Sequence, residues 1–441
     1  MLFFHQRSMG CGLILVLPLI LFIHPTNGYD PLDPNGNITI RWDIMLNNEG
    51  SQDVKVSIFN YQLFRHIDQP GWKLSWSWPG NEVIWDMSGA EATEQGDCSA
   101  IKATQPPHCC EKEPVIIDLL PGAPYNKQVA NCCRGGVLTS LTQDPEKYGA
   151  SFQMNIGSAS YNGSEPRVPE NFTLGIPGYT CGDPFEVPPS KFNVDQGRRK
   201  TQAVATWNVI CSYSQFRASS SPTCCVSLSA FYNNTIVPCP KCSCGCQGQL
   251  GADQCVKYGE LPPVLQLDHN EPPKPVVQCS QHMCPIQIHW HVKQSYTQYW
   301  RVKMTIRNLN YVKNYSQWNL VVLHPNLRSI TQVFSFNYKP LNQYGDTNDT
   351  GMFYGIEYYN DMLLQAGETG NVQSELLMHR DAGIFTFREG WVFPRKISFN
   401  GEDCVLPSPD DYPRLPNSSQ FMAPSIFTII VFFLSLILTL F

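Results

Sequence analysis

The chain has 441 residues, with 37 acidic and 31 basic side chains and a formal net charge of −6 at pH 7. This mild acidity gives no reason to expect nucleic-acid binding and names no other partner. Only 15% of the residues are charged, while there are 35 prolines and 18 cysteines, which is typical of an extracellular β-rich protein. The length allows two or three domains.

The N-terminus has the pattern of a secretory signal. Arg7 precedes an apolar run from Cys11 to Ile23, and small residues lead up to Tyr29. We therefore expect a signal peptide over residues 1–28, with cleavage after Gly28. The cluster of Asp, Pro, Asn and Gly over residues 30–37 predicts turns in preference to a calcium site.

Much of the chain that follows occurs twice. The alternating segments Ile38–Ile44 and Val54–Asn60 recur as Ile286–Val292 and Val302–Asn308. Alternation of apolar and polar residues predicts strands with one buried face. After a small difference in loop length, residues 71–84 align with residues 317–330. We therefore expect tandem β-sandwiches, in which the two pairs of matching tryptophans, Trp42 with Trp290 and Trp72 with Trp318, lie in the cores.

Residues 71–85 contain four of the ten tryptophans. As a strand, this segment places Trp72, Trp76 and Trp78 on one face, which is either the core side of a sandwich or a flat surface on which a ligand stacks. The second copy has Val322, His324 and Thr331 where the first has Trp76, Trp78 and Trp85. Folding alone therefore does not demand tryptophan at those three positions. We predict that Trp76, Trp78 and Trp85 bind carbohydrate, each contributing roughly 2–3 kcal/mol by covering ~100 Å².

The cysteines predict disulfides, because a secreted chain passes through an oxidising compartment. Removal of Cys11 with the signal leaves an odd number, so one thiol is left over. Adjacent cysteines occur at positions 109–110 and 132–133. We expect the two members of each pair to bridge to separate places. The cluster Cys239–Cys246 has zinc-like spacing, but no histidine lies close by in the sequence and disulfides are favoured.

The composition divides the chain into regions. We expect an N-terminal sandwich over residues 29–189, a cysteine-rich middle region over 190–259, a proline-rich linker over 260–278, a C-terminal sandwich over 279–404 and a proline-rich stalk over 405–417. Strand-like segments of the middle region form either a third sandwich or the closing strands of the first. His289 and His291 alternate with apolar residues, so we expect them on a solvent face and not in a metal site.

The C-terminus resembles a glycosylphosphatidylinositol (GPI) anchor signal: small residues at 417–419, a short uncharged spacer, then an apolar tail. The tail, Ile426–Phe441, spans only about 24 Å as a helix against a ~30 Å hydrocarbon core, which argues against a transmembrane helix. We expect attachment at Asn417 and removal of residues 418–441. Six further sequons predict N-glycosylation in the secretory pathway: Asn37, Asn162, Asn171, Asn233, Asn314 and Asn348.

No nucleophile elbow, zinc-protease motif or phosphate loop is visible. Carboxylate pairs suited to glycoside hydrolysis can be found anywhere among 37 acidic residues and carry no signal. We therefore predict a binding protein and not an enzyme, with neither metal nor cofactor.

The chain resembles the plant COBRA family nearly from end to end. The resemblance is carried by YDPLDPNGNITIRWD, HIDQPGWKLSWSW, NCCRGG, the Cys-Cys-Val-Ser segment at Cys224–Ser227, CPKCSCGC, QHMCPIQIHWHVKQ and NVQSE. It implies a GPI-anchored glycoprotein of the outer plasma-membrane face and cell wall that assists the deposition or orientation of cellulose microfibrils without catalysis. The partners implied are cellulose or a related β-glucan and the outer leaflet of the membrane; protein partners are unknown.

Two alternatives to cellulose binding remain open. The first is a cell-surface adhesion or receptor-type protein that binds other wall or membrane proteins and affects cellulose indirectly. The second is a glycan-remodelling enzyme, which would release sugar from glucan.

Overall fold

The computed structural model describes residues 33–48, 50–158, 167–194, 197–214, 218, 223–240, 255–256, 277–278, 285–311, 313–341, 349–383 and 385–415. The expected signal peptide, the cysteines at 242–246, most of the linker, the sequons at Asn162 and Asn348, and Asn417 lie outside these residues. Within the described ranges, no helix has the length and apolar character needed to span a bilayer.

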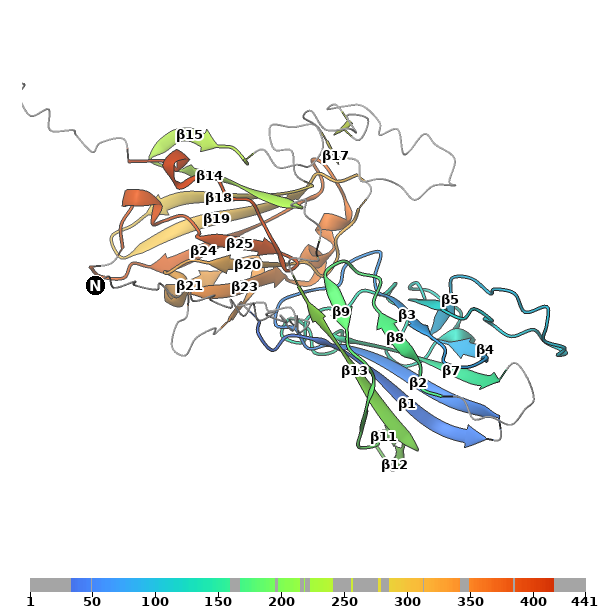
Figure 1. Cartoon of the computed structure of the whole chain (residues 1–441). Coiled ribbons are helices and arrows are strands. Elements are labelled where there is room, and N and C mark those ends of the chain that lie inside the picture. Colours follow the sequence, from blue (N-terminus) through green and yellow to red (C-terminus); the bar gives the residue numbers. More distant parts are fainter. Residues whose placement is uncertain are drawn as a thin grey trace, which may run out of the picture.

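The chain forms two lobes, each built from β-sheets (Figure 1). The first lobe, here called the first sandwich, contains one large sheet in the order β10-β13-β1-β2-β7-β4, with β9 also paired to β13, and a smaller sheet in the order β5-β6-β3-β8. The strands of the large sheet are β10 (Phe185–Val187), β13 (Ala205–Tyr213), β1 (Ile38–Asn48), β2 (Ser51–Asn60), β7 (Gly149–Ser158), β4 (Glu82–Ser88) and β9 (Tyr179–Cys181); those of the small sheet are β5 (Ala90–Ala92), β6 (Val115–Asp118), β3 (Lys73–Ser77) and β8 (Glu170–Thr173).

The core of the first sandwich lies between these two sheets. Alternate residues of β1, β2 and β7 meet Leu74, Ile116 and Phe172 from the small sheet, and all are buried. Trp72 stacks on Phe152 of β7 with ring centroids 6.0 Å apart. A separate hairpin of β11 (Lys191–Val194) and β12 (Arg199–Gln202) extends from this lobe.

The second lobe, the second sandwich, repeats this two-sheet plan. One sheet has the order β15-β14-β18-β19-β24-β21 and the other has the order β22-β23-β20-β25-β26. Their strands are β15 (Asn233–Val237), β14 (Cys224–Ala230), β18 (Ile286–Ser295), β19 (Tyr299–Asn308), β24 (Asn371–His379), β21 (Ile330–Val333), β22 (Phe336–Pro340), β23 (Thr350–Gly355), β20 (Asn319–Leu323), β25 (Lys396–Phe399) and β26 (Glu402–Asp403).

The remaining elements are short. β16 (Cys255–Val256) pairs with β17 (Val277–Gln278). The helices among the described residues are single 3-10 turns: η1 (Tyr125–Lys127), η4 (Leu327–Ser329), η5 (Glu357–Asn360), η6 (Met362–Leu364), η7 (Arg388–Gly390) and η8 (Pro409–Asp411). The expectation of an all-β chain of disulfide-bonded sandwiches is confirmed.

The sequence repeat is a structural repeat. The antiparallel pairs β1–β2 and β18–β19 each shift register after the same position of the repeat, Ile44 in one and Val292 in the other. At the end of the second strand, a fully buried asparagine donates a hydrogen bond to the carbonyl five residues on, Asn60 to Arg65 at 2.8 Å and Asn308 to Lys313 at 3.0 Å. The four matching tryptophans are buried, as predicted.

The described part of the middle region is divided between the two sandwiches. β13 pairs with β1 and completes the large sheet of the first, whereas β14 pairs in parallel with β18 of the second. The sequence left open whether these strands form a third sandwich or close the first. β13 is a closing strand of the first sandwich, whereas β14 belongs to neither arrangement because it joins the second sandwich.

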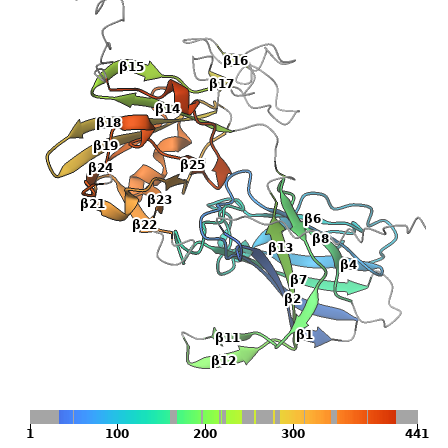
Figure 2. The ribbon, with the colours of Figure 1, turned by 60° about the vertical axis from the view of Figure 1, so that its left-hand side comes forward.

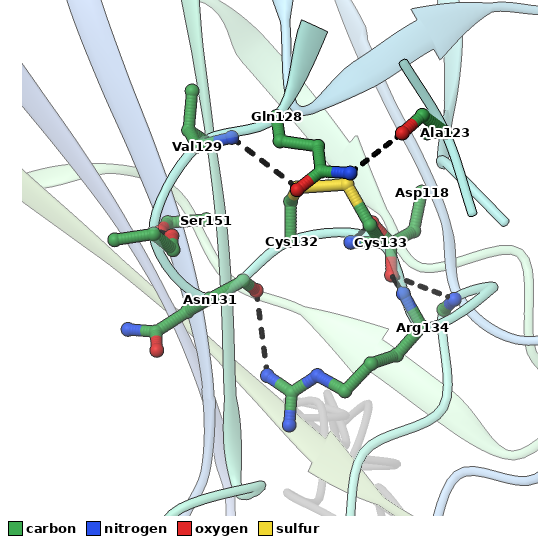
Figure 3. Close-up of a disulfide and its surroundings, with 11 residues drawn as sticks. Asp118, Ala123, Gln128, Val129, Asn131, Cys132, Cys133, Arg134 and Ser151 are labelled. Atoms are coloured by element: carbon green, nitrogen blue, oxygen red, sulfur yellow. Dashed lines mark hydrogen bonds between the residues drawn. A yellow bond between two sulfur atoms is a disulfide. The ribbon is translucent and has the colours of Figure 1, made fainter. Parts of the chain in front are cut away.

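Five disulfides join described cysteines: Cys98–Cys110, Cys132–Cys133, Cys181–Cys211, Cys224–Cys404 and Cys225–Cys239. The expectation that the members of each adjacent pair bridge to separate places is wrong. Cys132 and Cys133 bond to each other (Figure 3), and of the other pair only Cys110 forms a disulfide. The loop that they close is anchored by Asp118, whose carboxylate accepts the backbone N–H groups of Cys133 and Arg134. Among the cysteine side chains that the structure describes, Cys109 is the free one, and it is buried.

The two lobes contact each other (Figure 2). Phe64 of the first sandwich packs against Val321, Leu341 and Met352 of the second. Asn319 donates to the carbonyl of Phe64 at 2.7 Å, and several other polar groups bond across the boundary. The interface therefore fixes one lobe against the other with both apolar and polar contacts.

Candidate functional site

The structure contradicts the predicted carbohydrate platform at two of its three positions. Trp76 and Trp78 are each 1% exposed and lie inside the first sandwich. Their rings pack edge-to-face against Trp42, with centroids 5.4 and 6.1 Å away. Neither ring can reach a polysaccharide while the sandwich is folded.

The equivalent positions of the second sandwich explain the error. Val322 and His324 are also fully buried, and His324 stacks on Trp290 with centroids 5.8 Å apart. The two copies therefore fill the same inward positions with different side chains. A residue that does not recur between copies can still belong to the core, because the neighbouring side chains change with it.

Trp85, the third predicted residue, is half-buried and lies on the outer face of the large sheet. It occupies a register shift between Ile84 and Asp86. Its ring lies over Gly157 of β7, where an added methyl group would stand 2.7 Å from the indole Nε1. Glycine is thus the residue that lets Trp85 lie along the sheet.

A second group of aromatic rings occupies the other end of β7. Phe59 and Tyr61 stack with ring centroids 5.8 Å apart, and Tyr148 lies 5.7 Å from Phe59. All three side chains are half-buried. The guanidinium of Arg41 lies 5.2 Å from the centre of the Phe59 ring. Burial is the main reason why the pKa of Tyr61 is raised, so its hydroxyl keeps its proton and can donate a hydrogen bond.

The register of the large sheet shows what lies between these two groups. Directly paired residues point to the same side of a sheet, so Arg41, Ser57 and Ser151 form one row, which Asn208 and Phe185 extend. The next row contains Asp43, Lys55 and Gln153. Phe185 is 45% exposed. In these two rows Ser57, Ser151 and Asp43 are buried, whereas Arg41, Lys55, Asn208 and Gln153 are at least partly exposed. The outer face therefore carries a few accessible hydrogen-bonding groups flanked by aromatic rings.

This surface, from Phe59 to Trp85 along β7, is here called the outer face. Gly149 pairs with Phe59 at one end and Gly157 underlies Trp85 at the other, about 27 Å apart at ~3.4 Å per residue. Between them is a hollow lined by polar residues that include Asp53, Asp86 and Asn155. Such a length and mixture of groups suits an extended polar polymer.

Comparison of the two copies of the repeat could have identified Phe59 as a candidate binding residue. The repeat aligns Phe59 with Arg307, and strand alternation puts both on the side opposite the buried Ile58 and Ile306. An outward position that is aromatic in one copy and charged in the other is a better candidate than an inward one. Tyr148 lies in no repeated segment, and only the fold brings it to Phe59.

The outer side of the second sandwich has different chemistry. Ser227 bonds to Nδ1 of His289 at 2.6 Å, and Ser229 bonds to Nε2 of His289 at 2.9 Å and to Nδ1 of His291 at 2.7 Å. The histidines lie on the partly exposed polar face, as predicted. Within the described ranges, no cluster of three or more His, Cys, Asp or Glu side chains is arranged to hold a metal ion.

Comparison with known proteins assigns the chain to a family. Residues 52–214 match the COBRA N-terminal domain, and residues 223–263 and 257–413 match the COBRA family C-terminal domain. The chain belongs to the COBRA family. The boundary between the two matches falls between β13 and β14, where the sheets also separate the sandwiches.

Individual COBRA-family relatives are similar over almost the whole chain. COBRA-like protein 6 of Arabidopsis thaliana is 57% identical over 426 residues, which cover 93% of each chain. COBRA-like protein 1 of Oryza sativa subsp. japonica is 55% identical over 95% of this chain and 94% of its own. Protein COBRA of Arabidopsis thaliana is 52% identical over 92% of each. The resemblance inferred from the sequence motifs is therefore confirmed.

Proposed function

We propose that this chain is a GPI-anchored extracellular glycoprotein that binds cellulose through the outer face of its first sandwich and assists the assembly or orientation of microfibrils without catalysis. The observation that carries this proposal is the pair of solvent-facing aromatic groups, Phe59 with Tyr61 and Tyr148 at one end and Trp85 at the other. The membrane anchor at Asn417 and the six N-glycans remain part of the proposal.

Aromatic rings hold glucans by covering the apolar faces of the sugars, and hydrogen bonds to hydroxyl groups fix their orientation. Burying ~100 Å² per ring supplies roughly 2–3 kcal/mol, which does not exceed the cost of association for one ring. Several rings on one face supply enough for binding near the micromolar range, about −8 kcal/mol. Arg41, Asn208 and Gln153 provide polar groups between the aromatic ends.

The test is sedimentation of the secreted chain, ending at residue 417, with crystalline and with amorphous cellulose. Truncation there removes no described residue. The double variant Phe59→Ala, Tyr61→Ala should lose at least about tenfold in affinity, because more than about 1.4 kcal/mol of stacking is removed. The matched control is Arg307→Ala, at the equivalent position of the second sandwich, and it should bind normally. Equal binding by the double variant and the control would contradict the proposal.

The glycan expected at Asn37 needs its own control. The carbonyl of Asn37 accepts the backbone N–H of Tyr61 at 2.9 Å, so a glycan there lies beside the aromatic group. If the rings bind cellulose, Asn37→Gln should retain or increase binding. If instead they hold the chain's own glycan, Asn37→Gln should lower thermal stability, and neither the wild type nor the variant should bind cellulose.

Protein binding is the second candidate, and one surface favours it. The loop before the Cys132–Cys133 disulfide exposes Leu120 and Tyr125, at 71% and 91%. An adhesion role through this loop predicts capture of a wall or membrane protein that is lost in Leu120→Ser, Tyr125→Ser, with cellulose binding absent from the wild-type chain.

A further inference from the structure

The second sandwich carries a row of cations along one strand, β19. Its side chains alternate between the core and the solvent, and the outward positions of residues 301–307 are Arg, Lys, Thr and Arg. Arg307 is exposed, whereas Arg301 and Lys303 are half-buried. The row is about 20 Å long at ~3.4 Å per residue. Lys293, at the register shift of the neighbouring strand β18, widens the positive surface.

The first copy of the repeat has no such row. The charged residues at outward positions of its strand pair, β1–β2, are two cations and two carboxylates: Arg41, Asp43, Asp53 and Lys55. The corresponding strand pair β18–β19 has four cations and no carboxylate: Lys293, Arg301, Lys303 and Arg307. His291 stands where the first copy has Asp43, and Arg301 where it has Asp53. The positive sheet thus belongs to a chain whose net charge is −6.

A carboxylate from β24 neutralises one end of the row and leaves the other end charged. Lys293 and Arg301 both form ion pairs with Glu375. The pKa of Glu375 is lowered, first by the hydrogen bond from Lys293 and then by the nearby positive charges, against the opposing effect of burial. Within the described ranges, Lys303 and Arg307 form no ion pair. Their charges are therefore available to an anionic ligand.

The side chains beside the row are uncharged. Burial lowers the pKa of His291, and the charges of Lys303 and Lys293 lower it further, so its imidazole is neutral at pH 7. Thr305 lies between the two unpaired cations and pairs across the sheet with Gln373 of β24, which is exposed. The surface therefore combines separated positive charges with an accessible amide. This combination suits a ligand that carries both carboxylates and hydroxyl groups.

We propose that Arg301, Lys303 and Arg307, here called the cationic row, bind a linear acidic polysaccharide, a polyuronate, along β19. Its carboxylates pair with Lys303 and Arg307, and its hydroxyl groups bond to Gln373. Individual surface ion pairs contribute little, so the affinity comes from several carboxylates of one polymer engaging together. A line of cations along a strand matches a polymer chain better than it matches the plane of charge that a bilayer presents. The inference goes beyond cellulose binding and uses none of its residues.

The experiment is isothermal titration calorimetry of the secreted, glycosylated chain, ending at residue 417, with polygalacturonate and with its fully methyl-esterified form. The buffer contains no calcium, so that the polymer stays soluble. We expect binding of polygalacturonate and none of the neutral ester. Raising the ionic strength from about 0.1 to 1 M shortens the screening length from ~10 to ~3 Å and should abolish most of the binding.

Two double variants test whether the position of the charges decides. Lys303→Gln, Arg307→Gln should weaken polygalacturonate binding at least about tenfold. The matched control is Arg41→Gln, Lys55→Gln, which changes the net charge equally on the first sandwich and should bind polygalacturonate as the wild type does. Glu375→Gln should instead strengthen binding, because it removes a negative charge beside the row. A residue with only a structural role would not show this opposite change.

The outcomes separate this proposal from cellulose binding. Equal affinity for the neutral ester, or equal losses in the two double variants, overturns the polyuronate proposal. Vesicles of phosphatidylcholine and phosphatidylserine are the other arm. If they bind the chain through Lys303 and Arg307 while polygalacturonate does not, the row is a lipid-binding surface and the proposal is wrong. Lys303→Gln, Arg307→Gln should sediment with cellulose normally, and Phe59→Ala, Tyr61→Ala should bind polygalacturonate normally, so each proposal can fail alone.

Discussion

The two sandwiches share an inner framework and differ on their outer sides. Both have the same strand pair with the same register shift, and both end the second strand of that pair with a buried asparagine. On the outside, Phe59 of the first corresponds to Arg307 of the second, and Arg41 corresponds to His289. Folding therefore keeps the same positions inward in both copies, even where their side chains differ, while the outward positions differ in chemistry.

The largest effect is expected inside the first core. Trp76→Ala should lower the free energy of unfolding by about 3–5 kcal/mol, because it leaves a cavity beside Trp42 and Trp78. The matched change in the second copy, Val322→Ala, removes less volume and should cost about half as much. Urea unfolding followed by tryptophan fluorescence measures both. Unchanged stability in Trp76→Ala would mean that its ring does not lie in the core.

The second effect is a pH dependence of the free energy of unfolding that arises in the second sandwich and not in the first. Burial lowers the pKa of His324 to about 3, whereas the equivalent Trp78 does not titrate. His324 of the unfolded chain takes up a proton near pH 6.5, whereas His324 of the folded chain does so only near pH 3. Between these two pH values the unfolded chain binds more protons than the folded chain, so the free energy of unfolding falls as the pH falls. From pH 7 to 5 the loss should be about 2 kcal/mol for this group.

His324→Phe keeps an aromatic ring beside Trp290 and should remove that part of the pH dependence. Urea unfolding at pH 7 and pH 5 checks the difference. His66 has a similarly lowered pKa and should account for a further decline that His324→Phe leaves in place. An identical slope in wild type and variant would contradict the assignment to His324.

The third effect concerns the outer faces. Exchanging the equivalent residues, Phe59→Arg in the first copy and Arg307→Phe in the second, should abolish most cellulose binding in the former and create none in the latter. The reason is that Arg307 has no neighbours equivalent to Tyr61 and Tyr148, since Leu309 takes the position of Tyr61 and is buried. Sedimentation with cellulose gives the answer, and gain of binding in Arg307→Phe would show that a single ring suffices.

The smallest effect is expected at the far end of the outer face. Trp85→Ala should reduce cellulose affinity about three- to tenfold, equivalent to about 0.7–1.4 kcal/mol, because only part of the ring is accessible. Gly157→Ala should act in the same direction by displacing the ring. Thermal melting is the control, and a drop in melting temperature without loss of affinity would assign Trp85 to packing alone.

The fold was largely predictable because strand alternation and the repeat reinforce each other. Both the alternation and the repeat indicate which side chains point into the core, so the buried tryptophans at 42, 72, 290 and 318 could be named from the sequence. The same alternation also placed Trp76 and Trp78 inward, on the face of Trp72. The comparison of copies pointed the other way, and it was wrong because Val322 and His324 fill the same inward positions in a core whose neighbouring side chains also differ.

The candidate sites were less predictable because they depend on contacts between distant segments. Tyr148 joins Phe59 across β2 and β7, and Phe64 packs against Val321 across the two lobes. The Cys132–Cys133 bond departs from the geometric preference for separated cysteines, which is a tendency and not a rule. Alternation reports which residues point inward, but it reports neither which cysteines bond nor which aromatic side chains meet.

The Cys224–Cys404 disulfide has a mechanical consequence. It joins the first strand of the second sandwich to the segment that leaves it, and Val405 also pairs with β14 through the backbone of Cys224 and Val226. Tension applied beyond residue 405 therefore crosses the sulfur bridge directly to residue 224, and the intervening strands carry no load. A pull between that end and the first sandwich strains the junction of the lobes, not the second core, so force would be felt first where Phe64 packs against the second sandwich.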